Sequence, residues 1–196
     1  ANLGRLYRGW GELSNDPQER VEKWQRALEF YEQAITLSPN SAHLYNEYGL
    51  TYQMLGEYEK AEQLYRKSLS LDQEFDQTYM FMGELYRLQK RWDEAAEAYQ
   101  HVIELKPSAQ AYSALGYVYA QQGKLAEAIA ANEKVLELAP NDLASHRNLA
   151  LLYQRTGELD KALAHARRAR ELAPENQRPQ LEALIQQIKQ MQGANE

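Results

Sequence analysis

The chain has 196 residues, a formal net charge of −6 and no cysteine. This composition excludes disulfides and thiolate chemistry, and the acidity argues against a nucleic-acid ligand, because a phosphate-binding surface needs positive charge. The sequence contains 44% hydrophobic residues but no run of about 18 apolar residues, so we expect a soluble chain without a membrane-spanning helix.

Five columns of residues recur along the chain at intervals of 33 or 34. The most regular column is alanine, at Ala27, Ala61, Ala95, Ala128 and Ala162. Glycine, proline and two tyrosine columns keep the same register, at Gly49, Gly83 and Gly116; at Pro39, Pro107, Pro140 and Pro174; at Tyr52, Tyr86, Tyr119 and Tyr153; and at Tyr31, Tyr65 and Tyr99. This pattern resembles the tetratricopeptide repeat (TPR), a helical hairpin of about 34 residues. The resemblance implies an all-α fold, a right-handed α-solenoid superhelix of TPR hairpins with a C-terminal capping helix.

Residues 1–41 form a divergent, TPR-like first hairpin. Asp16 and Pro17 are typical of a helix N-cap followed by a first-turn proline, and Glu19 is typical of a capping-box acid. Compared with the later repeats, about 11 extra residues stand between the two helices, around residues 8–18. We expect an extended inter-helix segment there, which is either a terminal variation, the interpretation we favour, or a docking element.

Four regular repeats follow, at residues 42–75, 76–108, 109–142 and 143–176. Apolar residues recur at helical spacing in each repeat, which predicts two amphipathic helices. The glycine between these helices is expected to be left-handed at Gly56, Gly123 and Gly157, with Lys90 as a costlier substitute. The Gly49 column lies inside a helix, where glycine is disfavoured, so it indicates that two helices approach closely.

The tyrosine columns are predicted to lie in the core. Asn132 and Ala166 interrupt the column of the second helices, so we expect the packing there to be looser or differently filled. Residues 177–196 contain a final amphipathic stretch, from Leu181 to Met191. It is expected to form a capping helix over the last open face of the array, followed by a tail.

In the TPR family the first helices of successive repeats line a concave groove. Carried onto this sequence, the resemblance implies a partner-binding groove made by thirteen side chains: Asn46, Leu50, Met54, Met80, Phe81, Glu84, Arg87, Tyr117, Gln121, Arg147, Asn148, Leu151 and Arg155. Its middle is apolar and its C-terminal end is basic, so we expect a partner helix or extended peptide with apolar anchors and an acidic end. Alternatively, Leu50, Met54 and Phe81 pack against neighbouring helices, and both interpretations stay open.

Two better-defined groove chemistries of the family are not expected. The carboxylate clamp for chaperone C-termini needs a set of lysine and asparagine residues that this chain lacks. The asparagine ladder that grips a peptide backbone needs Asn in successive repeats, where this chain has Glu47, Phe81, Ala114 and Asn148.

No catalytic residue, metal site or cofactor is predicted. The four histidines, His43, His101, His146 and His165, lack the paired spacing of metal ligands, and the glycines do not form a phosphate loop. We therefore expect a non-catalytic scaffold for protein–protein interaction that binds a protein or peptide ligand, without nucleic acid or membrane insertion by this segment.

Two other functions stay open. One is a structural or assembly module that forms weak homo-oligomers through its terminal faces. The other is a regulatory tail of a membrane-bound polysaccharide polymerase or ligase, because the stretch from Tyr31 to Tyr52 resembles the soluble TPR tails of bacterial O-antigen polymerase or ligase-type membrane proteins. The sequence starts at Ala1 rather than Met, which indicates an excised or processed chain. We favour a cytoplasmic location for this segment, and membrane attachment of the parent protein stays open.

Overall fold

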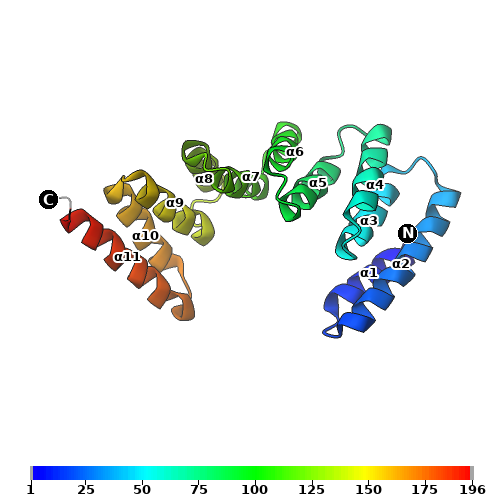
Figure 1. Ribbon diagram of the computed structural model, residues 1–196, viewed down its shortest axis with the longest axis horizontal. Helices are drawn as coiled ribbons and strands as arrows, with labels where there is room; N and C mark the ends of the chain where they lie inside the picture. The colour runs from blue at the N-terminus through cyan, green and yellow to red at the C-terminus, as the bar shows by residue number, and fades with distance from the viewer. Residues whose placement is uncertain (1, 195–196) are drawn as a thin grey trace. The chain divides into compact units, whose positions relative to one another are not determined.

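The computed structural model describes residues 2–194, which contain eleven α-helices, one 3-10 helix and no β-strand. Consecutive helices pair into hairpins (Figure 1): α1 (Asn2–Leu13) with α2 (Pro17–Leu37), α3 (Ala42–Met54) with α4 (Tyr58–Leu71), α5 (Asp76–Leu88) with α6 (Trp92–Leu105), α7 (Ala109–Gln121) with α8 (Leu125–Leu138), and α9 (Leu143–Thr156) with α10 (Leu159–Leu172). The 3-10 helix Glu175–Gln177 and α11 (Arg178–Gly193) follow. The predicted all-α fold of helical hairpins is confirmed.

The helices belong to two compact units, which we call unit 1 and unit 2. Unit 1 ends at Leu105 and contains α1 to α6, whereas unit 2 begins at Lys106 and contains α7 to α11. None of the helices within residues 2–194 is long and apolar enough to cross a membrane.

The first hairpin is longer than the others, but its extra residues are helical. The prediction of an extended segment around residues 8–18 was wrong, because only Ser14, Asn15 and Asp16 lie between α1 and α2. Relative to the second hairpin, α1 continues four residues further past its core tyrosine and α2 begins seven residues earlier before its core alanine. Eleven residues make about three helical turns, so the apolar faces of the two helices still meet.

The predicted helix ends are confirmed at several positions. The Asp16 side chain accepts a hydrogen bond from the Gln18 amide and caps α2. Gly56, Gly123 and Gly157 have φ values of +79°, +77° and +82°, in the left-handed region that favours glycine. Lys90 takes the same conformation with φ 58°, as the residue that replaces glycine in the third hairpin.

Helical glycines allow close contact between the two helices of a hairpin, as predicted. A Cβ atom placed on Gly49 would lie 2.8 Å from the Tyr65 ring, and one on Gly83 would lie 2.5 Å from the Tyr99 ring. A side chain at either position would therefore displace the aromatic ring that fills the hairpin.

The C-terminal helix α11 packs on the last hairpin of unit 2. Ile185 and Ile188 join the buried cluster of α9 and α10, and Leu181 joins Ala169 and Ala173. The helix therefore buries one apolar face, as expected of a capping helix.

Candidate functional site

In unit 1 the predicted groove residues lie on α3 and α5 and expose little apolar surface. Asn46 has no exposed surface at all, so it belongs to the interior. Leu50, Met54, Met80 and Phe81 are half-buried. The Phe81 ring centroid lies 6.1 Å from that of Tyr65, whose side chain is fully buried.

The two charged groove residues predicted in unit 1 bind each other. Arg87 Nε donates to a Glu84 carboxylate oxygen at 2.8 Å, and the Tyr99 hydroxyl donates to the same carboxylate at 3.3 Å. The hydrogen bonds from Arg87 hold the pKa of Glu84 below its usual range despite partial burial. Glu84 and Arg87 are therefore already paired with each other on α5, and the Tyr99 hydroxyl joins this pair to α6.

Further ion pairs on the first helices of unit 1 were not identified from the sequence. Arg8 of α1 donates to Glu47 of α3 at 3.0 Å, and the buried Tyr31 hydroxyl donates to the same carboxylate at 3.2 Å. Burial, assisted by the Glu47 charge, raises the pKa of Tyr31 to about 12. Arg8 follows Tyr7 as Arg87 follows Tyr86, but the repeat pattern does not say which helix supplies its partner, so only the contact between α1 and α3 reveals this pair.

Unit 2 brings five of the predicted residues together around one pocket. The pocket has a volume of about 200 Å³ and lies between α7 and α9, with a lining of Gly116, Tyr117, Ala120, Gln121, Asn132, Asn148, Leu151, Leu152 and Arg155. Tyr117 and Leu151 are 44% and 42% exposed. Two apolar side chains are thus presented at the rim of a hollow, which is the usual arrangement of a small binding site.

The pocket lies where the tyrosine column is interrupted. Asn132 of α8 stands where unit 1 has Tyr65 and Tyr99, and it packs against Gly116 as those rings pack against their glycines. The Asn132 amide donates to the Ala128 carbonyl at 2.8 Å, and its oxygen accepts from Asn148 at 3.3 Å. The smaller Asn132 side chain leaves open the space that a tyrosine ring would fill. The interruption of the tyrosine column in the sequence therefore marks the position of the pocket.

A second pocket lies on the other side of α9. It has a volume of about 180 Å³ and is lined by Leu143, Arg147, Leu151, Gln177, Gln180, Leu181 and Leu184. The sequence indicated Arg147 and Leu151 but not the four residues of the C-terminal segment, for which only a capping role was predicted. Leu151 lines both pockets.

Arg147, Leu151 and Arg155 form one exposed stripe on α9, since residues four apart share a face of a helix. Within the residues that the structure describes, neither guanidinium makes a hydrogen bond or an ion pair. This face of α9 therefore presents two cations, without partners among the described residues, on either side of an apolar side chain.

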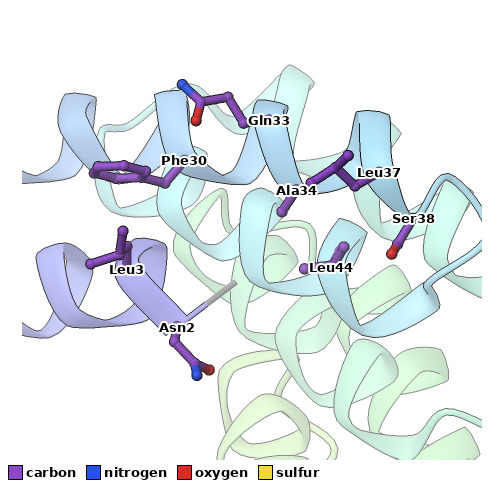
Figure 2. A pocket seen from close by; sticks show the side chains of 8 residues that line it. All are labelled: Asn2, Leu3, Phe30, Gln33, Ala34, Leu37, Ser38 and Leu44. Atoms are coloured by element: carbon purple, nitrogen blue, oxygen red, sulfur yellow. The ribbon is translucent and has the colours of Figure 1, made fainter.

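Another cavity of unit 1 lies beside the first hairpin, and none of the predicted groove residues lines it. It measures about 530 Å³ and is lined by Asn2, Leu3, Phe30, Gln33, Ala34, Leu37, Ser38 and Leu44. Figure 2 shows Leu3 of α1 below Phe30 of α2 at one end of the space, and Leu44 of α3 below Ala34 at the other. The sequence did not indicate this hollow.

The four histidines include one close pair. His146 Nδ1 lies 3.0 Å from His165 Nδ1, and His146 Nε2 lies 3.1 Å from the Pro140 carbonyl oxygen. Burial, together with the neighbouring His146, lowers the pKa of His165. Over residues 2–194, no group of three or more His, Cys, Asp or Glu side chains is placed to hold a metal ion.

Two family models match the chain. The model of the cilia and flagella-associated protein 70 middle TPR-like domain matches residues 13–139, and a tetratricopeptide-repeat model matches residues 107–175. In contrast, no curated protein matches the sequence.

Several solved structures are similar to this chain. MamA is 25% identical with a TM-score of 0.72, and the match covers 82% of this chain and 96% of MamA. MamA 41-end from Desulfovibrio magneticus RS-1 is 22% identical with a TM-score of 0.71, and the match covers 88% and 96%. YrrB, described as a TPR protein with an unusual peptide-binding site, is 23% identical with a TM-score of 0.70, and the match covers 94% and 90%. These likenesses support the TPR fold.

Proposed function

The chain belongs to the family of the cilia and flagella-associated protein 70 middle TPR-like domain, and so to the tetratricopeptide-repeat proteins. From this premise we propose that it is a non-catalytic interaction scaffold that binds a peptide through unit 2. The observation that carries the proposal is the pair of pockets beside Leu151, on the face of α9 that the TPR resemblance assigns to ligand binding. YrrB, which shares the fold, is described as having a peptide-binding site.

Binding accounts for the groove better than catalysis does. A hydrolytic or transfer reaction needs a nucleophile, an acid or a base held beside the bound substrate. The groove of unit 2 instead presents amides, apolar side chains and two arginines. The close histidine pair spans α9 and α10, and neither histidine lines either pocket.

The pockets fit side chains of an extended peptide better than a whole helix. Each has a volume of 200 Å³ or less, enough for one apolar side chain. A partner helix is about 10–12 Å wide and needs a broader hollow. A dissociation constant of about 1 μM is ordinary for a groove of this kind.

A random library of linear twelve-residue peptides, displayed on phage and selected on the full chain, tests the proposal. We expect enrichment on the wild-type chain, loss of enrichment on the Tyr117→Ala, Leu151→Ala double variant, and retention on Leu138→Ala. Leu138 is a matched control because it is 54% exposed and lines neither pocket. Equal enrichment on all three chains would refute binding through unit 2.

Assembly through the N-terminal face is a second candidate, supported by one observation. Leu3, Leu6, Trp10 and Leu13 make an apolar stripe on α1 and are between 50% and 84% exposed. If copies associate through this stripe, light scattering of the wild-type chain will show a concentration-dependent dimer that Leu6→Glu abolishes and Leu138→Glu does not. A monomer at every concentration would remove this candidate.

The matches reported above include no O-antigen polymerase or ligase. The resemblance of the stretch from Tyr31 to Tyr52 to the tails of those proteins, and with it a regulatory role beside a membrane enzyme, therefore stays a prediction.

A further inference from the structure

We infer that unit 2 selects an acidic extended peptide with two carboxylates four residues apart and an apolar residue midway between them. The inference rests on the proposed function, that unit 2 binds a peptide. It goes further because it specifies the charge of the ligand and the spacing of its contacts.

The first line of evidence is the state of the arginines on α9. Arg147 and Arg155 are exposed and, in the described part of the chain, neither has an ion-pair partner. In unit 1, by contrast, Arg8 and Arg91 bind Glu47 and Glu62 at 3.0 Å and 2.8 Å. The guanidinium is well suited to bidentate binding of carboxylates, so the two unpaired arginines of the groove match a ligand with carboxylates.

The second line of evidence is spacing. A helix rises about 1.5 Å per residue, so Leu151 lies about 6 Å and Arg155 about 12 Å along α9 from Arg147. In an extended peptide, residues i, i+2 and i+4 point to one face and are separated by about 6.6 Å and about 13 Å. A peptide with the pattern Glu-x-Leu-x-Glu, laid along α9, therefore places its three side chains opposite the three members of the stripe.

The third line of evidence is what surrounds the centre of the stripe. Leu151 lines both pockets, with Tyr117 on the side of α7 and Leu184 on the side of α11. An apolar side chain at the middle of the peptide can enter either hollow. The amides of Asn148 and Gln180 stand at the same two pockets and can bind the peptide backbone.

Charge distribution favours the same ligand. Unit 1 carries 11 Lys and Arg against 18 Asp and Glu, a balance of −7, whereas unit 2 carries 11 against 10, a balance of +1. An acidic peptide is therefore repelled by unit 1 and accepted by unit 2, and electrostatic steering of this kind raises association rates most at low salt.

The defined probe is the labelled peptide Ser-Glu-Ser-Leu-Ser-Glu-Ser, titrated with the full chain and followed by fluorescence anisotropy. Two control peptides are its isomer Ser-Glu-Glu-Leu-Ser-Ser-Ser and the version with Gln in place of both Glu residues. We expect about fivefold weaker binding of the isomer and at least about tenfold weaker binding of the Gln version. Binding of the probe should also weaken between about 50 mM and about 500 mM salt.

Three arginine variants separate specific contacts from general attraction. Arg147→Gln and Arg155→Gln should each weaken binding of the probe about tenfold. Arg167→Gln should leave it unchanged, because Arg167 is exposed on α10 and lines neither pocket. Equal weakening by all three variants would indicate attraction by net charge alone and would overturn the inference, as would failure of the probe to bind at about 1 mM.

The phage selection distinguishes failure of this inference from failure of the proposed function. Peptides that depend on Tyr117 and Leu151 for binding but carry no acid pair, and that bind Arg147→Gln and Arg155→Gln as well as wild type, would overturn the acidic pattern and leave peptide binding intact. Enrichment that the Tyr117→Ala, Leu151→Ala variant retains would refute the groove itself.

Discussion

Unit 1 and unit 2 are built from the same helical hairpins but fill the space between the two helices differently. In unit 1 the rings of Tyr31, Tyr65 and Tyr99 are almost completely buried. In unit 2 the same positions are held by Asn132 and Ala166, and a pocket of about 200 Å³ opens beside Asn132. The tyrosines stabilise their hairpins, whereas the smaller residues leave room that a ligand side chain can occupy.

Charged residues on the first helices of the hairpins also differ between unit 1 and unit 2. Glu84 binds Arg87 and Tyr99 in unit 1, and Glu47 binds Arg8 and Tyr31 there. The arginines of α9 in unit 2 have no such partners in the described part of the chain. If unit 2 binds a peptide as proposed, a position on the first helix either stabilises the array or binds the ligand, and the residue opposite it decides which.

The largest expected difference in stability between the units comes from replacing residues in the tyrosine column of the second helices with alanine, at Tyr99 in unit 1 and at Asn132 in unit 2. Tyr99→Ala removes a buried aromatic ring and should lower the free energy of unfolding by about 3–5 kcal/mol. Asn132→Ala removes two side-chain hydrogen bonds, one to the Ala128 carbonyl and one from Asn148, beside an existing pocket and should cost about 1–2 kcal/mol. Urea denaturation followed by circular dichroism measures both losses of stability. Equal losses would mean that the second helices of the two units pack alike at this position.

A glycine substitution tests the close contact that only unit 1 makes with an aromatic ring. Gly83→Ala places a Cβ against the Tyr99 ring and should destabilise by about 1–3 kcal/mol, despite the better helix propensity of alanine. The matched control is Gly9→Ala in α1, where nothing lies within 4 Å and alanine should stabilise by up to about 1 kcal/mol. If the penalty of Gly83→Ala persists when Tyr99 is replaced by Ala, the ring is not its cause.

Asn132→Tyr converts the pocket of unit 2 into the filled hairpin of unit 1. Gly116 still provides the gap over which a ring can lie, so we expect the variant to fold with unchanged helix content. Peptides selected on the wild-type chain should bind it at least about tenfold more weakly, by anisotropy, because the ring occupies the site of an apolar anchor. Unchanged affinity would show that the ligand does not enter this pocket.

Much of the fold could be predicted from the sequence because it depends on local rules. The 34-residue spacing of alanine, glycine and tyrosine identifies the hairpins, and Gly56, Gly123 and Gly157 identify their left-handed turns. The first hairpin was harder, because an insertion of 11 residues reads equally well as a loop or as three added turns. Only the packing of a longer α1 against a longer α2 decides between them.

The candidate site was predictable in part, for a different reason. Helical spacing placed Arg147, Leu151 and Arg155 on one face, but it treated α5 and α9 as equivalent. Whether a charge is already paired also depends on side chains from other helices, as Arg8 of α1 shows for Glu47 of α3. The contribution of α11 was missed because its amphipathic pattern predicts burial of one face and says nothing of the residues at the edge of that face.

The smallest expected effect is a loss of stability at acidic pH, caused by the histidine pair of unit 2. His146 Nε2–H donates to the Pro140 carbonyl, so His146 Nδ1 is left to accept from His165 Nδ1–H at 3.0 Å. Protonation of both rings would bring two N–H groups together. Burial and His146 lower the pKa of His165 in the folded chain, while Glu133 opposes the shift. The unfolded chain therefore binds more protons near and below pH 6.5, so the contribution to stability is complete above that value and declines as the pH falls.

Thermal unfolding at about pH 7.5 and about pH 5.5 measures this effect. The difference in Tm between the two pH values should shrink in His165→Gln, because glutamine does not titrate, and should persist in His101→Gln, because His101 is exposed and lies outside the α9–α10 hairpin. Arg87 holds the pKa of Glu84 below its usual range, so Glu84 does not titrate in the window just below pH 6.5. If Tm falls by the same amount at acidic pH in both variants, the pH dependence comes from residues outside the α9–α10 hairpin. The two units would then not differ in the pH dependence of their stability.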